Sequence, residues 1–150
     1  MLKAEPDFVG KTFAPDAGVI EAMQISESAS RPVGIADTQD NPGAGGDSNT
    51  TGRLRALVRK NAQSAALGNM VDPKAAKAAH AAGQGAEIEI ALGGFSNIPG
   101  DSPFEGRVPV ETLSEGTRIA QSPCYGREPM DLGPSASARI GVRGGSVTQQ

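Results

Sequence analysis

Residues 37–51 spell Asp-Thr-Gln-Asp-Asn-Pro-Gly-Ala-Gly-Gly-Asp-Ser-Asn-Thr-Thr, an acidic and glycine-rich stretch between two apolar segments. The apolar segment before it, Pro32–Ala36, is typical of a buried strand. After residues 37–51, the apolar residues Leu54, Leu57 and Val58 recur at the spacing of one helix face. This pattern predicts a strand, a tight turn and a helix, in that order.

The predicted strand covers about Val33–Asp37, and the predicted helix runs from Asn49 or Thr50 to Lys60, with Asn49, Thr50 or Thr51 as its N-cap. A glycine-rich turn that opens a helix places free backbone N–H groups and the positive end of the helix dipole at one point. That arrangement suits an anion or a polar group of a substrate.

The acidic residues of this stretch limit which ligands it could bind. Asp37, Asp40 and Asp47 would repel a bare phosphate, and the stretch lacks both the Gly-Lys-Ser/Thr ending of a P-loop and the G-x-G-x-x-G spacing. A polar or peptide-like ligand, or a metal shared with another domain, fits better. The site would be lined by Asp37, Asp40, Asn41, Gly43, Gly45, Gly46, Asp47, Thr50 and Thr51. A purely structural turn, which needs Asn, Pro and Gly for its dihedrals, stays open beside this hypothesis.

The residues after this stretch alternate between strand and helix patterns. Ser64–Val71 is a second apolar run. Asp72, followed by proline, is a helix start signal, and the alanine-rich helix Pro73–Ala82 should stop at Gly83. Gly85–Leu92 alternates between apolar and acidic residues, as a half-exposed strand does. The order predicts an α/β fold with a βαβαβ layer of mostly parallel strands.

The second half is predicted to be rich in strands and loops. Gly93–Pro103 is a long polar loop, and Arg107–Glu111 alternates around a central proline that places it at a sheet edge. Ser135–Val142 alternates again, and Gly144–Gly145 is typical of a hairpin turn into a last strand that ends at Gln150.

Composition predicts one domain with a thin core. The 150 residues are 37% hydrophobic but only 3% aromatic, with no Trp, so the core must use Ala, Val, Ile and Leu. Residues 1–15 should form an extended lead-in, with a helix starting at Asp16 and ending before Ser30. Residues 16–150 should form the domain, and we expect its last strand, after Gly145, to be cut short.

Charge and cysteine content limit the partners. The net charge is −3, and the basic residues Arg53, Arg55, Arg59 and Lys60 surround one predicted helix, which favours a solvated face over a nucleic-acid site. A lone Cys124 excludes an internal disulfide and favours a reducing compartment. No signal peptide and no apolar run of about 18 residues is visible, so we expect a cytoplasmic protein without membrane contact.

Catalytic groups are scarce in this sequence. His80 is the only histidine, has no acid or cysteine at ligand spacing, and is expected to face solvent. Cys124 has no base near it in sequence, so a catalytic thiol is not expected. Ser48, Thr50 and Thr51 are expected to act as helix caps rather than as nucleophiles.

Several motifs resemble one family in the right order. Asp40-Asn41-Pro42-Gly43, the following glycines, Asp47 and Thr50-Thr51 resemble the Asp-Asn-Pro-Gly-Gly-Gly…Gly-Asp-Thr-Thr signature of the C-terminal domain of microcystinase C (MlrC)-type metallopeptidases. Further similar segments are Leu54–Leu57, Asp72–Ala76, Ala82–Ala86, Leu92–Gly94, Asp131–Gly133 and Gln149–Gln150. The loop departs from the signature at Ala44 and at the inserted Ser48–Asn49.

The resemblance implies zinc-dependent hydrolysis of a peptide-like amide by the full-length relatives. It places the zinc ligands in a metal-bearing N-terminal domain, on the same or a separate chain, and implies that this chain alone binds no metal and is inactive. The loop would then line the substrate cleft. Two alternatives remain: a non-catalytic structural or homo-oligomerisation domain or remnant, and a module that binds a small anion at the helix start near Thr50.

Overall fold

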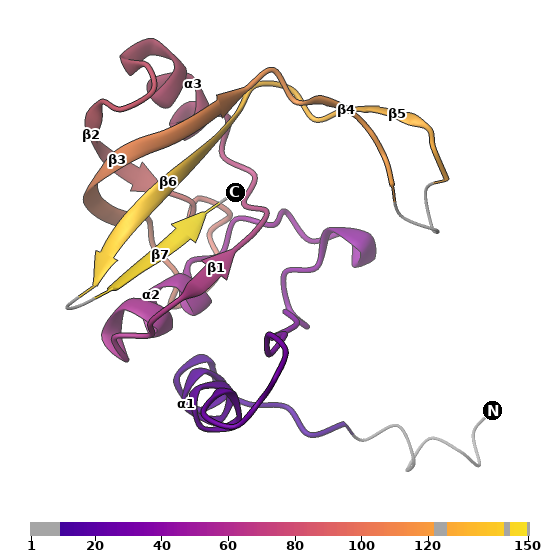
Figure 1. Cartoon of the computed structure of the whole chain (residues 1–150), viewed down its shortest axis with the longest axis vertical. Helices are drawn as coiled ribbons and strands as arrows, with labels where there is room; N and C mark the ends of the chain where they lie inside the picture. Colours follow the sequence, from indigo (N-terminus) through magenta and orange to yellow (C-terminus); the bar gives the residue numbers. More distant parts are fainter. Residues whose placement is uncertain (1–9, 122–125, 143–144, 150) are drawn as a thin grey trace.

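The computed structural model describes residues 10–121, 126–142 and 145–149 and contains a five-stranded sheet and a separate two-stranded ribbon (Figure 1). The helices are α1 (Pro15–Ser26), the short 3-10 helix η2 (Pro42–Ala44), α2 (Gly52–Arg59) and α3 (Pro73–Ala82). The strands are β1 (Ala65–Leu67), β2 (Glu87–Leu92), β3 (Phe104–Ser114), β4 (Thr117–Ile119), β5 (Pro129–Asp131), β6 (Ser135–Val142) and β7 (Gly145–Gln149).

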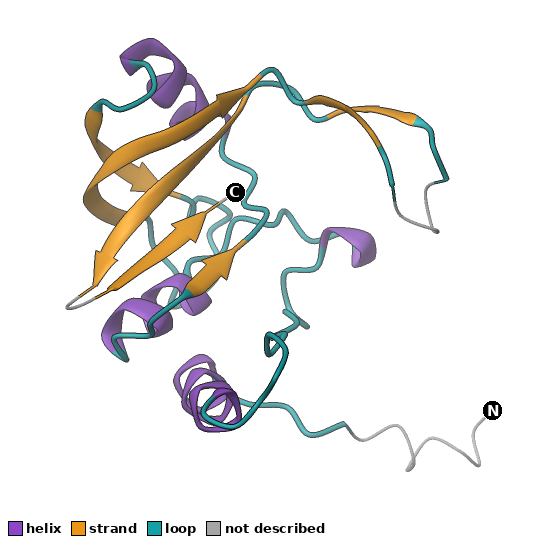
Figure 2. Cartoon of the chain, viewed as in Figure 1, coloured by secondary structure: helices purple, strands orange, loops and turns teal. Residues whose placement is uncertain are grey.

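The main sheet has the order β1-β7-β6-β3-β2. Only β1 and β7 run parallel, whereas β2–β3, β3–β6 and β6–β7 are antiparallel pairs. The α/β class is therefore confirmed, but the predicted layer of mostly parallel strands is not found. Among the described residues, all helices come before β2, and only strands and loops follow it (Figure 2).

Two observations account for this difference: the first predicted strand is absent, and β1 and β2 lie at opposite edges of the sheet. The prediction of a strand over Val33–Asp37 is wrong, since residues 32–37 form no strand and Ile35 is 38% exposed. The carbonyl of Ile35 accepts a hydrogen bond from Arg53, and the Asp37 carboxylate accepts the N–H groups of Gln39 and Asp40. These side-chain contacts fix the segment as a turn beside α2 rather than as a strand.

The strand predicted at Arg107–Glu111 is present, but its predicted position at a sheet edge is wrong. β3 is 11 residues long and lies between β2 and β6 in the interior of the sheet. Successive amides of a strand point to opposite sides, and the N–H of Val110 donates to Ala86 on the β2 side. The nitrogen of Pro109 therefore points to the β6 side, where the paired residues begin only at Val110–Ala138. The missing N–H thus removes no ladder bond.

Where the signal was local, the predicted elements are confirmed. α3 has the predicted bounds, with Asp72 as N-cap and Gly83, at φ 89°, as C-cap. β6 has its predicted bounds and pairs with β7 as a hairpin, although Gly144 lies outside the described residues. Within Ser64–Val71, only β1 forms a strand.

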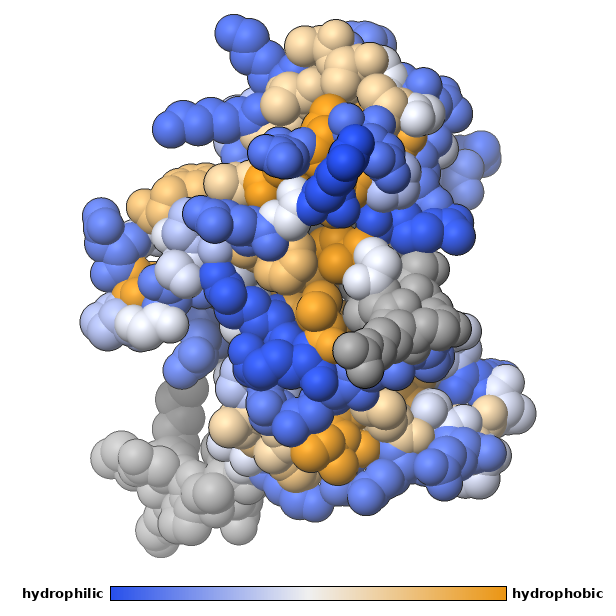
Figure 3. Space-filling model, turned by 90° about the vertical axis from the view of Figure 1, so that its left-hand side faces the viewer, coloured by the Kyte–Doolittle hydropathy of each residue, from blue (hydrophilic) through white to orange (hydrophobic). Residues whose placement is uncertain are grey.

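The core is small and aliphatic, as composition predicts. Buried Val19 of α1 and Leu54 of α2 share one cluster with Leu92, Val108 and Ile140 of the sheet. Viewed from the side that carries α3 and β2, apolar surface runs as an interrupted band between hydrophilic residues (Figure 3). Within the described ranges, no helix is long and apolar enough to cross a bilayer.

Candidate functional site

The acidic side chains of the glycine-rich loop hold the loop together. One carboxylate oxygen of Asp37 accepts the N–H groups of Gln39 at 2.9 Å and Asp40 at 3.2 Å, while the other lies 3.1 Å from Arg53 Nε. This ion pair ties the beginning of the loop to the first turn of α2.

Asp40 closes the loop from the inside. Its side chain is 6% exposed, and its two oxygens accept the N–H groups of Ser48 and Thr50, each at 2.8 Å. Burial acts to raise the pKa of Asp40, but the hydrogen bonds from Thr50 and Ser48 outweigh it and hold the pKa below its usual value. The carboxylate is therefore charged and fully engaged within the chain.

The loop needs its asparagine and glycines for conformation. The Asn41 side chain accepts the N–H of Gly43 at 2.8 Å and so starts η2, which ends at Gly45 with φ 89°. A Cβ on Gly46 would lie 2.8 Å from the backbone nitrogen of Asn41, closer than real Cβ atoms approach. These contacts support the structural role that the sequence left open for this turn.

The N-terminus of α2 is capped from another part of the chain. Thr51 occupies the N-cap position, as predicted, but its side chain does not cap the helix. Instead, the Asp101 carboxylate accepts the N–H of Thr51 at 3.2 Å and its hydroxyl at 2.7 Å. Arg55 donates to the Thr51 hydroxyl at 3.0 Å and to the Ser102 hydroxyl at 2.9 Å. Sequence reasoning missed Asp101, which lies fifty residues away in a polar loop with no local signal.

A second bridge joins the same two loops. Ser96 donates to the Asp47 carboxylate and accepts from the Asn49 amide at 2.6 Å. The carbonyl of Asn49 accepts the N–H of Gly94 at 2.7 Å. Asn49 is 1% exposed, and its side-chain oxygen has no partner among the described residues. Asp47 and Asn49 therefore connect the two loops through Ser96 and Gly94.

A groove of about 750 Å³ lies next to the glycine-rich loop. Of the predicted site residues, Asp37, Asp40 and Asn41 line it. The remaining predicted residues do not: Gly43, Gly45, Gly46, Asp47, Thr50 and Thr51. Sequence reasoning missed the other walls, which come from α3, β2, β6 and the β4–β5 ribbon: Ala75, Ala76, Ala79, Ile88, Ile90, Ala136, Ala138, Arg118 and Leu132.

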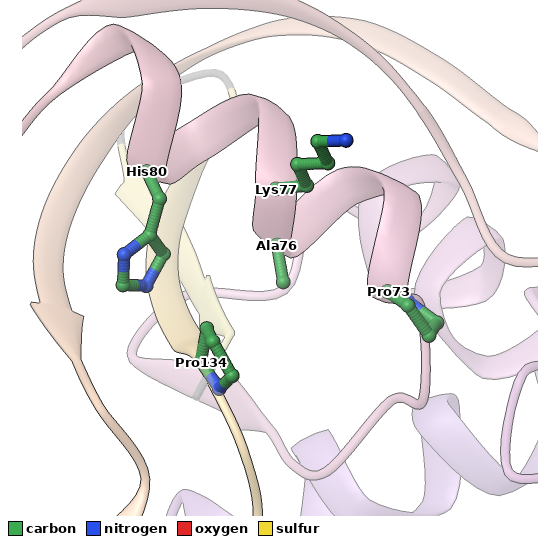
Figure 4. Close-up of a pocket in the computed structure, with 5 residues that line it drawn as sticks. All are labelled: Pro73, Ala76, Lys77, His80 and Pro134. Atoms are coloured by element: carbon green, nitrogen blue, oxygen red, sulfur yellow. The ribbon is translucent and has the colours of Figure 1, made fainter.

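His80 is not solvent-facing as predicted, because it is half-buried and its Nε2 lies 3.0 Å from the carbonyl oxygen of Ser135 on β6. It lines a second, shallower hollow of about 350 Å³ with Pro73, Ala76 and Pro134, and Figure 4 shows the histidine ring directed toward the Pro134 side. The described residues contain no group of three or more His, Cys, Asp or Glu that could hold a metal ion, while Cys124 lies outside them.

Three of the basic residues on and directly after α2 form ion pairs, although the side chain of Arg59 remains 53% exposed. Arg59 and Lys60 both contact Asp16 of α1, Lys60 at 3.2 Å, while Arg53 contacts Asp37. Hydrogen bonds from Arg59 and Lys60 lower the pKa of the Asp16 carboxyl. These ion pairs hold α1 against α2.

Comparisons with known proteins agree with the motif order. A family model described as MlrC C-terminus matches residues 35–148. Microcystinase C of Sphingomonas sp. is 27% identical over 102 residues, which are 67% of this chain and 20% of that protein. A crystal structure of a protein assigned as a metallopeptidase, from Mesorhizobium sp. BNC1, superposes with a TM-score of 0.78 at 20% identity.

The structural match covers 99% of this chain but only 28% of the Mesorhizobium chain. The chain therefore spans only a fifth to a little over a quarter of the length of the relatives it matches. The fold is that of one part of a larger protein in those relatives. Because the family model covers most of its length, including the glycine-rich loop, the chain belongs to the MlrC C-terminus family.

Proposed function

We propose that this chain is the C-terminal, substrate-facing part of a microcystinase C-like zinc metallopeptidase, with a metal-bearing N-terminal domain opposite its groove. The observation that carries the proposal is the groove of about 750 Å³, bordered by Asp37, Asp40 and Asn41, in a chain of this family. Grooves of this size hold small organic or peptide ligands.

Zinc in the other domain would polarise the scissile carbonyl and activate water. The described residues do not offer a ligand set for that ion, so this chain would contribute binding and orientation. The groove would receive the apolar part of a peptide-like substrate. The side-chain NH₂ of Asn41 has no partner among the described residues and would donate to a substrate carbonyl, while the Asn41 oxygen keeps the loop in place.

A fusion enzyme tests this function. This chain would replace the C-terminal domain of microcystinase C, and hydrolysis of a linear peptide would be compared with that by the N-terminal part alone. We expect turnover only from the fusion. A fusion that folds and holds its metal, yet hydrolyses no faster than the N-terminal part alone, would contradict the proposal.

A purely structural role is the second candidate, because Asp37 and Asp40 are occupied by internal hydrogen bonds. Asn41→Asp in the fusion separates the two, since aspartate keeps the acceptor oxygen but removes the NH₂ donor. Reduced turnover at an unchanged melting temperature favours the cleft role, whereas unchanged turnover favours the scaffold. Anion binding near Thr50 is disfavoured, because its N–H and that of Thr51 already donate to carboxylates.

A further inference from the structure

The walls of the groove are mainly small and apolar. Ala75, Ala76 and Ala79 of α3 line it together with Ile88 and Ile90 of β2. At the mouth, Val71 is 51% exposed and Leu132 is 49% exposed, and both line the groove. Exposed apolar side chains around a concave apolar surface indicate a ligand that carries an apolar group.

The carboxylates that line the groove are already engaged. Asp37 and Asp40 accept hydrogen bonds within the glycine-rich loop. Asp72 accepts the N–H groups of Lys74 and Ala75 with one oxygen and that of Gly93, at 2.9 Å, with the other. None of the three presents an open oxygen that would need a cationic ligand.

The two arginines that line the groove differ in whether their side chains are already paired. Arg53 is held 3.1 Å from Asp37 and donates to the carbonyl of Ile35. Arg118 of β4 is exposed and lines the groove, and its side chain has no hydrogen bond or ion pair with any of the described residues. None of the described residues occupies the donors of its guanidinium, so these can bind an anion beside the apolar surface.

Arg118 lies on a two-stranded ribbon. β4 and β5 form a ribbon that projects from the sheet, with Arg118 paired to Met130 (Figure 1). At its base, the N–H of Leu132 donates to the carbonyl of Gly116 at 3.2 Å. The ribbon thus brings Arg118, whose side chain has no partner among the described residues, to the same groove as the glycine-rich loop.

We propose that Arg118 binds a carboxylate of a ligand whose neighbouring apolar side chain enters the alanine-walled groove. The ligand class is a short peptide with an apolar residue next to a free carboxylate, either its C-terminus or an acidic side chain. This inference rests on the proposed function for the peptide nature of the ligand, and it adds a residue that sets specificity for a negative charge.

Three dipeptide probes test it on the full chain by calorimetry: N-acetyl-Leu-Leu as the free acid, the same peptide as its C-terminal amide, and N-acetyl-Glu-Leu amide. We expect the unmodified chain to bind at least one carboxylate probe about five- to tenfold more tightly than the neutral amide. Which acid binds identifies the source of the carboxylate.

Arg118→Met should abolish the preference for acid over amide while leaving amide binding unchanged. Arg127→Met is the matched control, because Arg127 is exposed on the same ribbon but does not line the groove. Equal binding of acids and amide, a preference that survives Arg118→Met or is lost in Arg127→Met, or no binding of any probe would overturn the inference. Hydrolysis by the fusion enzyme is measured separately, so a failure here is distinguishable from a failure of the proposed function.

Discussion

At the scale of single residues, the acidic positions of the glycine-rich loop act first on the fold. Asp40 shows this best, since its buried carboxylate receives two backbone N–H groups that have no other acceptor in the turn. The sequence marked Asp40 as a site residue because of its position in the motif. Its internal role depends on the path of the chain between Asp40 and Thr50, which no local pattern predicts.

Asp40→Asn should lower the free energy of unfolding by about 1 to 3 kcal/mol at neutral pH, because an amide replaces a charged acceptor of two buried hydrogen bonds. Chemical denaturation measures the change. Asp47→Asn is the matched control, since Asp47 is exposed and lies in the same loop. An equal loss in both variants would argue against a special role for Asp40.

The same residue predicts a pH dependence. The folded-state pKa of Asp40 lies below the usual value of 3.8, so its stabilising contribution is complete above pH 3.8 and is lost as the pH falls toward the folded-state value. The stability difference between the unmodified chain and Asp40→Asn should therefore shrink below about pH 4. Denaturation curves between pH 2.5 and 7, a range chosen around the usual carboxyl pKa of about 4, measure it. A difference that stays constant with pH would contradict the lowered pKa.

At the scale of elements, sequence signals worked where an element carries its own boundaries. Asp72, the proline after it and Gly83 define α3 without help from the rest of the chain. β3 could not be predicted in this way. The nitrogen of its central proline points to a stretch where β6 does not pair with β3, which is why the proline is tolerated. That arrangement depends on how β3 is aligned with β2 and β6.

Asp72 joins two elements, since it caps α3 and also holds the turn after β2 through Gly93. Asp72→Ala should therefore cost about 1 to 3 kcal/mol, more than the roughly 1 kcal/mol of an ordinary N-cap. Denaturation of Asp72→Ser would separate the two roles, because serine keeps a cap acceptor but does not reach Gly93 with a second oxygen. Equal stability of the alanine and serine variants would rule out a cap contribution.

The β4–β5 ribbon should depend on the glycine at its base. A Cβ on Gly116, at φ 82°, would lie 1.9 Å from the carbonyl oxygen of Gly133. Gly116→Ala should shift the amide resonances of the ribbon and weaken binding of carboxylate probes, with little change in β2 and β3. Gly126→Ala is the control, since Gly126 also has a positive φ in the same ribbon but has open space around it. Equal shifts in both variants would mean that the close approach is unimportant.

At the scale of the whole molecule, the motif order indicated the family and the α/β class, but not the strand directions, because β1 and β2 lie at opposite edges of a sheet that is antiparallel except for its β1–β7 pair. The groove, too, could be predicted from the sequence only in part. Its loop side could be anticipated from the acidic motif, whereas its apolar walls come from α3, β2 and β6, which meet only in the folded chain.

Metal removal tests whether the whole chain carries a metal site of its own. Because the described residues contain no set of three metal-ligating side chains, chelation of the purified chain should leave its melting temperature unchanged. Metal analysis before and after dialysis against a chelator gives the stoichiometry. One zinc per chain together with a fall in melting temperature on chelation would show that the chain carries its own site.

The parallel pair of β1 and β7 has a consequence for the order of assembly. Ala65 of β1 pairs with Val147 of β7, although most of the domain's sequence lies between them, and β7 also pairs with β6. During synthesis on the ribosome, β1 therefore stays unpaired until β7, the last of the described strands, has been made. Until then its hydrogen-bonding edge is open to other chains, which makes this early segment the one that a chaperone would have most reason to shield.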